Sequence, residues 1–214
     1  VQTSSGKLYS VDTRLRPEGH DGLLVCSFEH FKHYQESTEG AWVWEHQALT
    51  RARFCAGDIE LGKAFEAERT RILCRPRETR TVQSAVVAMR RKILESCKNT
   101  SGLFDLKRDR GGMLDVEFAV QTLVLTKAHR YPQLTRNLGN SSLLAMSAEL
   151  GLIPNAIAEG SIRAYRTYRD IQRMTRLNLG ENTPVRVAPE KLRAEKEAVT
   201  ALWRTVLETD EPCA

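Results

Sequence analysis

The hydrophobic periodicity of the chain changes once, near Ser27, and this change constrains the fold more than any other feature. Between residues 8 and 16, apolar and polar side chains alternate, which is typical of a strand with one packed face. A short apolar run at 23–27 follows a polar turn, so the two segments together predict a β-hairpin. Because a hairpin alone is marginally stable in water, we expect it to close a larger sheet.

After Ser27 the apolar residues recur at helical spacing along most of the chain. Ser27 and Asp58 are expected to be N-caps, because their side-chain oxygens can accept hydrogen bonds from first-turn amides. We therefore predict a mainly α (α+β) protein, in which the hairpin is followed by a helical bundle, with a soft boundary near Gly57. The predicted helices cover 27–35, 41–53, 58–72, 81–97, 113–129, 141–150, 154–179 and 189–207.

Composition excludes several classes of protein. The 214 residues fit one domain or one domain plus a piece of another, and the net charge of +5 is mild. Such a charge suits a phosphorylated ligand or an acidic partner and is too dispersed for a nucleic-acid arm. The cysteines are far apart and lack a C-x-x-C pair, which argues against disulfides and zinc. Without a signal peptide or a membrane-length apolar segment, a cytoplasmic protein is expected. Because the chain starts at Val1 within a polar turn, we also expect a fragment of a longer protein.

The stretch VDTRLRP at 11–17 places Asp12, Arg14 and Arg16 on one face of the first predicted strand. A carboxylate on a rigid strand can hold Mg²⁺, which in proteins usually has one or two carboxylate ligands plus substrate phosphates. The two guanidiniums could bind phosphate oxygens in a bidentate manner. The spacing of these three residues is explained at least as well by a ladder of Asp–Arg ion pairs on a solvated face of the sheet.

A second charged motif, FDLKRDRGGMLDVEF at 104–118, precedes and begins a predicted helix. Its glycines allow close backbone approach and a helix N-terminus attracts anions, so a phosphate could bind beside Lys107. The spacing is not that of a Walker loop. Asp115 and Glu117, two apart on a helix, point in nearly opposite directions, so they predict compensation of the helix dipole and not a metal pair.

Several stretches together resemble one known family. They are SSGKLYSVDTRLRPEGHDGLLVCS, AWVWEHQALTRAR and FDLKRDRGGMLDVEF, in this order along the chain. The family is the bacterial glutamine synthetase adenylyltransferases, which belong to the DNA polymerase β-like nucleotidyltransferase superfamily. EHQALTRAR and FDLK look more like the C-terminal, adenylylating half of this bifunctional enzyme. The likeness covers nearly the whole chain and weakens after about Gly180.

The resemblance implies a division of the chain and a set of site residues. Residues 1–57 would be the C-terminal remnant of a nucleotidyltransferase domain, and 58–214 the helical domain that follows it, related to that of PII uridylyltransferases. Asp12 would be catalytic, as a ligand of Mg²⁺ and as general base. Arg14, Arg16 and Lys107 would contact the nucleotide, or else brace the fold.

The resemblance also implies a reaction and partners. AMP from ATP would be transferred to a tyrosine of glutamine synthetase, under control of the PII signal protein and glutamine. The family's Gly-Ser turn and paired Asp-x-Asp carboxylates would come before Val1, so we expect the fragment alone to be inactive.

Two other functions remain open from the sequence. The chain could come from the deadenylylating half, which uses phosphate to release ADP. It could also be a non-catalytic helical module that binds the PII protein or glutamine synthetase. A nucleotidyltransferase acting on nucleic acid is disfavoured, because the charge is mild and basic residues are not interleaved with aromatic ones.

Overall fold

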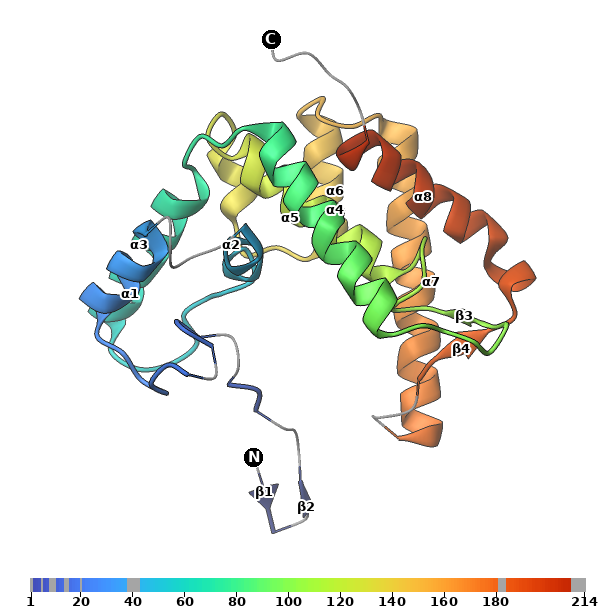
Figure 1. Cartoon of the computed structure of the whole chain (residues 1–214), viewed down its shortest axis with the longest axis horizontal. Helices are drawn as coiled ribbons and strands as arrows, with labels where there is room; N and C mark the ends of the chain where they lie inside the picture. Colours follow the sequence, from blue (N-terminus) through green and yellow to red (C-terminus); the bar gives the residue numbers. More distant parts are fainter. Residues whose placement is uncertain are drawn as a thin grey trace.

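The computed structural model describes residues 2–4, 6–7, 11–13, 16–19, 21–37, 43–180 and 184–208. In these residues eight α-helices account for most of the chain, and two short antiparallel strand pairs complete the secondary structure (Figure 1). The prediction of a mainly α protein with a small β-hairpin and a helical body is confirmed. Within the described part, no helix is long and apolar enough to cross a membrane.

The helices make up most of the described chain. In chain order they are α1 (Phe28–Glu36), α2 (Val43–Leu49), α3 (Ile59–Leu73), α4 (Thr79–Ser96), α5 (Met113–Lys127), α6 (Asn140–Glu149), α7 (Asn155–Leu179) and α8 (Arg193–Leu207). Two 3-10 turns are η1 (Pro132–Thr135) and η2 (Pro189–Leu192). The strands are β1 (Gln2–Thr3) with β2 (Gly6–Lys7), and β3 (Phe104–Asp105) with β4 (Arg186–Val187).

Two helices begin at the capping residues that the sequence predicts. Ser27 Oγ accepts a hydrogen bond from the amide of His30 at 3.1 Å, and Asp58 Oδ1 accepts one from the amide of Leu61 at 2.8 Å. Each side chain thus satisfies an amide that has no partner within the helix. Pro154 is the N-cap of α7, so the helix begins at Asn155, one residue after the start predicted at 154.

The predicted hairpin between 8–16 and 23–27 is wrong in position. Residues 11–13 and 23–27 form no strand, while residues 8–10, 14 and 15 lie outside the described residues. The side chains of Leu23 and Val25 are both 80% exposed. An apolar run becomes a strand only beside another strand, and the described part holds none next to this segment.

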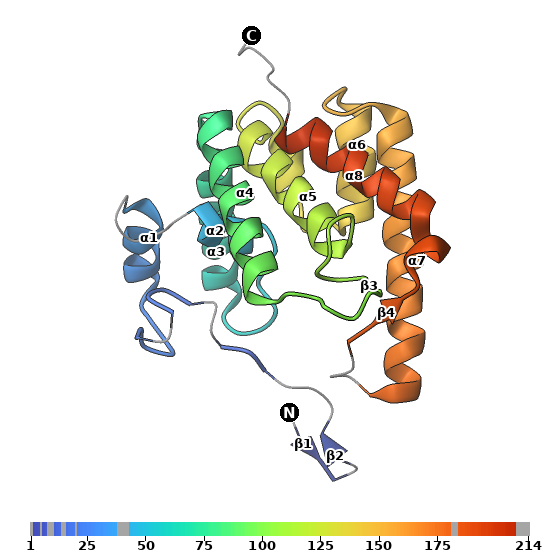
Figure 2. The same cartoon turned by 45° about the vertical axis from the view of Figure 1, so that its right-hand side comes forward.

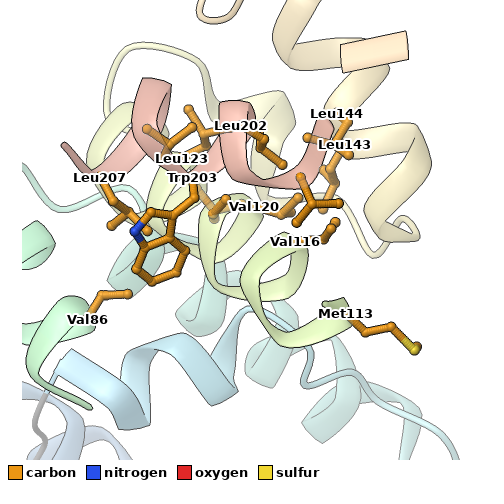
Figure 3. Close-up of a cluster of buried hydrophobic side chains, with 14 of the residues drawn as sticks. Val86, Met113, Val116, Val120, Leu123, Leu143, Leu144, Leu202, Trp203 and Leu207 are labelled. Atoms are coloured by element: carbon orange, nitrogen blue, oxygen red, sulfur yellow. The ribbon is translucent and has the colours of Figure 1, made fainter. Parts of the chain in front are cut away.

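The core forms around α5, which is buried on almost every side. Ten of its fifteen residues are buried, as expected of a helix that is apolar all round. It packs against α2, α4, α6, α7 and α8, and Figure 2 shows it between α4 on one side and α7 and α8 on the other. Figure 3 shows the cluster where α5 meets its neighbours, including Val86, Val116, Val120, Leu123, Leu143, Leu144, Leu202, Trp203 and Leu207.

The β3–β4 pair fixes the loop that leads into α5. β4 follows α7, so the pairing joins two segments far apart in the sequence. The amide of Leu106 donates to the carbonyl of Val185 at 3.1 Å, extending this connection by one residue. The ring of Phe104 lies 5.9 Å from that of Tyr168 on α7, and both side chains are buried. The second charged motif therefore rests on α7 and β4.

Candidate functional site

The described residues of the first predicted motif, 11–13, 16 and 17, form no helix or strand and precede α1. Asp12 is exposed, and the neighbouring Val11 side chain is 66% exposed. Arg14 lies outside the described residues. Arg16 Nε donates to the carbonyl of Gly22 at 3.1 Å, and its Nη1 donates to the carbonyl of Thr13 at 2.5 Å. Arg16 thus holds a local turn, which favours the bracing role over phosphate binding.

The described residues contain no complete magnesium site. Among them no three histidine, cysteine, aspartate or glutamate side chains come together as possible metal ligands. The exposed carboxylate of Asp12 could supply one oxygen ligand, whereas Mg²⁺ requires six. A complete site needs carboxylates or phosphates from elsewhere, so no chemical step is assigned to the chain alone.

The loop between β3 and α5 is held together by its own acidic side chains. Asp105 Oδ1 accepts hydrogen bonds from the amides of Lys107 and Arg108, each at 3.0 Å. Asp109 Oδ2 accepts one from the amide of Asp105 at 2.8 Å and one from the side-chain amide of Asn99 at 2.7 Å. Short acidic side chains that bind nearby amides in this way specify tight turns.

Beneath this loop, Arg90 of α4 and Asp115 of α5 form a buried ion pair. Arg90 Nε lies 2.5 Å from Asp115 Oδ1, and the two side chains are 4% and 6% exposed. Arg90 Nη2 also donates to the carbonyls of Arg108 and Asp109 at 2.7 and 3.1 Å. Asp115 Oδ2 accepts a hydrogen bond from the amide of Gly111 at 2.6 Å. Both charges are therefore tied to the loop as well as to each other.

The two glycines of the loop are required by its geometry. Gly111 has φ of +80°, a conformation that residues with a Cβ rarely adopt, and its carbonyl accepts a hydrogen bond from the Tyr168 hydroxyl at 2.9 Å. At Gly112, an added Cβ would lie 2.7 Å from the carbonyl oxygen of Leu106. Burial raises the pKa of Tyr168, so its hydroxyl stays protonated and remains a donor at neutral pH.

These contacts leave few backbone donors for an anion. Every amide from residue 111 to 115 already donates to an acceptor in the loop or in the first turn of α5. From residue 111 to 115, therefore, no free amide remains for a phosphate. Side chains remain: Lys107, Arg108 and Arg110 are exposed, and no ion pair within the described residues includes Lys107.

Asp115 and Glu117 act separately, as the sequence predicted. Glu117 Oε1 accepts a hydrogen bond from the hydroxyl of Tyr165 at 3.2 Å, whereas Asp115 pairs with Arg90. Burial, with a smaller contribution from Glu117, raises the pKa of Tyr165. Compensation of the helix dipole is therefore an incomplete account of Asp115, because its main partner is a guanidinium on another helix.

A second buried arginine anchors the end of α2. Arg69, 2% exposed, donates from Nε to the carbonyl of Leu49 at 3.0 Å and from Nη2 to that of Thr50 at 2.7 Å. Its Nη1 donates to the carbonyl of Thr135 in η1 at 2.7 Å. The last carbonyls of a helix lack partners within it, and here one guanidinium supplies them.

His46, from the motif AWVWEHQALTRAR, is part of a polar cluster between α1, α2 and α3. Its Nε2 lies 3.3 Å from the carbonyl oxygen of Gln35, and its Nδ1 lies 3.5 Å from Arg77 Nη2. Burial, and then the charge of Arg77, lowers the pKa of His46 to about 4. The neutral ring can then donate to Gln35 and accept from Arg77. Arg77 also donates to the carbonyls of Ile72 and Leu73 at the end of α3.

Sequence reasoning missed Arg90 and Arg69, the residues that organise these contacts. For Arg90 a signal exists, because Val82, Val86 and Arg90 are spaced by four and so share one face of a helix. The two valines and the arginine are all buried. A charged residue on an otherwise apolar stripe predicts a buried partner of opposite charge.

Arg14 lies outside the described residues, so the two motifs can be compared only through Asp12, Arg16 and Lys107. Within the described part, no hydrogen bond or ion pair joins the Lys107 side chain to Asp12 or Arg16.

Comparison with known proteins identifies relatives over nearly the whole chain. The family model described as glutamate-ammonia ligase adenylyltransferase matches residues 1–68. A protein of Aromatoleum aromaticum named bifunctional glutamine synthetase adenylyltransferase/adenylyl-removing enzyme is 50% identical over 96% of this chain and 21% of its own length. Proteins of the same name from Burkholderia mallei and Nitrosomonas eutropha are each 48% identical, over 95% and 97% of this chain. The chain spans about a fifth of the length of these relatives.

Proposed function

We propose a function from the chain's ancestry: over nearly its whole length, it is homologous to the bifunctional glutamine synthetase adenylyltransferase/adenylyl-removing enzymes. In our proposal it is part of an enzyme that transfers AMP from ATP to a tyrosine of glutamine synthetase and so regulates nitrogen assimilation in the cytoplasm. The identity of 50% over 96% of the chain carries this proposal. Because the chain spans about a fifth of its relatives, the active unit would be a longer protein.

We propose that the reaction proceeds in the direction of adenylylation. This is the activity of the half whose sequence EHQALTRAR and FDLK resemble. The relatives' name also includes adenylyl removal, so the reverse-acting half is the second candidate. The two candidates share a fold and differ in whether ATP or inorganic phosphate is consumed. Because the relatives are named as bifunctional, the two candidates are distinguished by which of the two activities the intact enzyme loses when Asp12 is substituted.

Asp12 is proposed as the catalytic carboxylate that this chain contributes. Its exposure supports this role, because a ligand of Mg²⁺ and ATP must be reachable from solvent. When bound, Mg²⁺ would neutralise charge on the phosphates, with further carboxylates supplied from outside the described residues. Residues 1–57 would complete a nucleotidyltransferase domain and 58–214 would form its helical neighbour; the family match to residues 1–68 supports the first assignment.

Lys107 is proposed as a contact to the nucleotide phosphates. Its backbone amide is fixed by Asp105, while its side chain is exposed and makes no ion pair in the described part. A rigid loop that presents an unpaired ammonium is suited to an anionic ligand. Arg14 is proposed as a second phosphate contact, and Arg16 as a brace because of its two carbonyl partners. The PII protein and glutamine would act as regulators of the longer enzyme.

The first experiment measures transfer of labelled AMP from Mg·ATP to purified glutamine synthetase by the intact enzyme that carries this segment. The enzyme is compared with its Asp12→Asn variant, and removal of AMP from pre-modified glutamine synthetase is measured on the same preparations. We expect labelling by the unmodified enzyme and loss of at least a hundredfold in the folded variant.

Each other result has a defined meaning. Equal labelling and equal removal of AMP by both forms would exclude a catalytic role for Asp12. Loss of phosphate-dependent AMP removal in the variant, with labelling retained, would assign the chain to the deadenylylating half. Labelling by residues 1–214 alone would refute the expectation that the segment needs the rest of the enzyme.

A further inference from the structure

The outer face of α7 carries a stripe of arginines. Arg163, Arg166, Arg169, Arg173 and Arg176 are spaced by three or four residues and all are exposed. Residues at this spacing lie along one side of a helix, and thirteen residues of helix extend about 20 Å. We call this set the arginine face. No lysine occurs in α7, so the basic groups are all planar guanidiniums, which bind carboxylates and phosphates in a bidentate manner.

The arginine face is only partly neutralised. Arg163 lies 3.8 Å from Glu159, and Arg173 lies 3.1 Å from Asp170. Within the described residues, no ion pair includes the other three arginines of the face. The face thus keeps an excess of positive charge that attracts an acidic surface.

Apolar side chains continue the same surface. Met174 is 55% exposed and Leu177 is 75% exposed. Arg166, Arg173 and Leu177 are related by seven and four residues, so the leucine lies in line with the arginines. Arginine and methionine are enriched in protein–protein interfaces, where apolar contacts in the centre accompany charged contacts at the rim.

The second half of α7 projects from the helical body. All buried residues of α7 lie at or before Tyr168, and none from 169 to 179 is buried. Figure 1 shows these last turns extending past α5 and α6, and Figure 2 shows the same from another side. A helix that extends beyond its own core presents its surface to other molecules.

We propose that the arginine face, with Met174 and Leu177, is a docking surface for an acidic surface patch of the protein substrate. This inference rests on the proposed function, because the relatives' name specifies a protein, glutamine synthetase, as the molecule that is modified. Complementary charge would increase the rate of encounter and orient the large substrate, while chemistry takes place elsewhere.

A protein fits this surface better than a nucleic acid. Glu159 and Asp170 lie among the arginines and would repel a continuous line of phosphates. The exposed apolar groups are aliphatic, whereas single-stranded nucleic acids stack their bases on aromatic side chains. The chain as a whole carries a net charge of only +5.

The test uses the intact enzyme with Arg166→Glu and Arg169→Glu combined. The matched control combines Arg91→Glu and Lys92→Glu, an equal charge change at two exposed residues of α4. The measurements are kcat, KM for glutamine synthetase and KM for ATP, together with binding of unmodified glutamine synthetase by interferometry. We expect KM and Kd for glutamine synthetase to rise about tenfold at low salt, with kcat and KM for ATP unchanged. The difference in KM and Kd for glutamine synthetase between the variant and the wild type should shrink in about 0.5 M salt, and the control should match the wild type.

Other outcomes would overturn the inference. Unchanged binding of glutamine synthetase, or an equal loss in the control, would show that the arginine face makes no specific contact. A lower melting temperature with changes in both KM values would show that the face packs against another part of the enzyme. Salt-dependent binding of RNA without a change in KM would indicate a nucleic-acid ligand. If the enzyme binds glutamine synthetase through this face but transfers no AMP in either direction, only the proposed function fails.

Discussion

Arg90 and Asp115 are 25 positions apart in the sequence, yet their Nε and Oδ1 atoms are separated by 2.5 Å inside the protein. The same two side chains bind three backbone groups of the loop between β3 and α5. The ion pair therefore links α4, the loop and α5 in one buried polar network.

Asp115→Asn should destabilise the chain strongly. The substitution keeps the shape but leaves the Arg90 guanidinium buried without a counter-charge, which costs about 3–5 kcal/mol. The free energy of unfolding in urea, followed by circular dichroism, measures this loss. Arg91→Ala, an exposed neighbour, should change it by less than about 0.5 kcal/mol. The double change Arg90→Met with Asp115→Leu should cost less than the single change; an equal or larger cost would contradict this account.

Gly112→Ala should destabilise the loop through steric overlap between the added methyl group and the backbone. The new methyl group would lie 2.7 Å from the carbonyl oxygen of Leu106, a backbone atom that can move only with the loop. We expect a loss of about 1–3 kcal/mol in the free energy of unfolding. Gly139→Ala is the control, because no atom lies within 4 Å of a Cβ there. Equal unfolding midpoints for the two variants would show that the loop tolerates the methyl group.

Tyr168→Phe tests the link between α7 and the loop. The change removes the donor to the Gly111 carbonyl and leaves that buried oxygen without this partner, at a cost of about 1–3 kcal/mol. Thermal unfolding provides the measurement. Tyr131→Phe should have little effect, because no hydrogen bond of its hydroxyl is found in the described structure. A similar melting temperature for both variants would argue against a stabilising role for the bond.

The stability of the chain should fall as the pH decreases from about 6.5 to about 4. His46 has its pKa lowered to about 4 in the folded protein, so between these values the unfolded chain binds more protons than the folded one. At 1.36 kcal/mol per pH unit, the loss is at most about 3 kcal/mol. Urea unfolding at several pH values measures it, and His46→Gln should flatten the curve over this range. If the free energy of unfolding of the variant falls with pH as steeply as that of the wild type, groups other than His46 cause the loss.

Lys107→Ala should weaken ATP binding by the intact enzyme without destabilising it. The side chain is exposed and unpaired in the described part, so its removal disturbs no contact seen here. A lost charge-assisted hydrogen bond to phosphate corresponds to about a tenfold rise in KM for ATP. Lys98→Ala, also exposed, is the control. Reduced stability with unchanged KM would favour the bracing role.

The sequence predicts those parts of the fold that local chemistry decides. Ser27 and Asp58 cap helices because the acceptor and the free amides are only three residues apart. The buried helix α5 could be predicted because its apolar residues cover its whole circumference. The strand predicted at 23–27 failed, because strands depend on neighbours that sequence pattern does not reveal.

The candidate site could be predicted only in part for a related reason. Lys107 and the glycines were identified from their motif, but the roles of Asp105 and Asp109 depend on which amides the turn brings within reach. Arg90 and Arg69 bind groups 18 to 66 positions away, and nothing in their immediate neighbours specifies those partners.

The contacts of Arg69 determine where the polypeptide can be cut. A truncated protein that begins at Asp58, the residue after the soft boundary at Gly57, would lose the carbonyls of Leu49 and Thr50. The guanidinium would then remain buried with one of its three backbone acceptors, Thr135. An expressible helical domain should therefore begin before α2, and such a domain crosses the boundary predicted near Gly57.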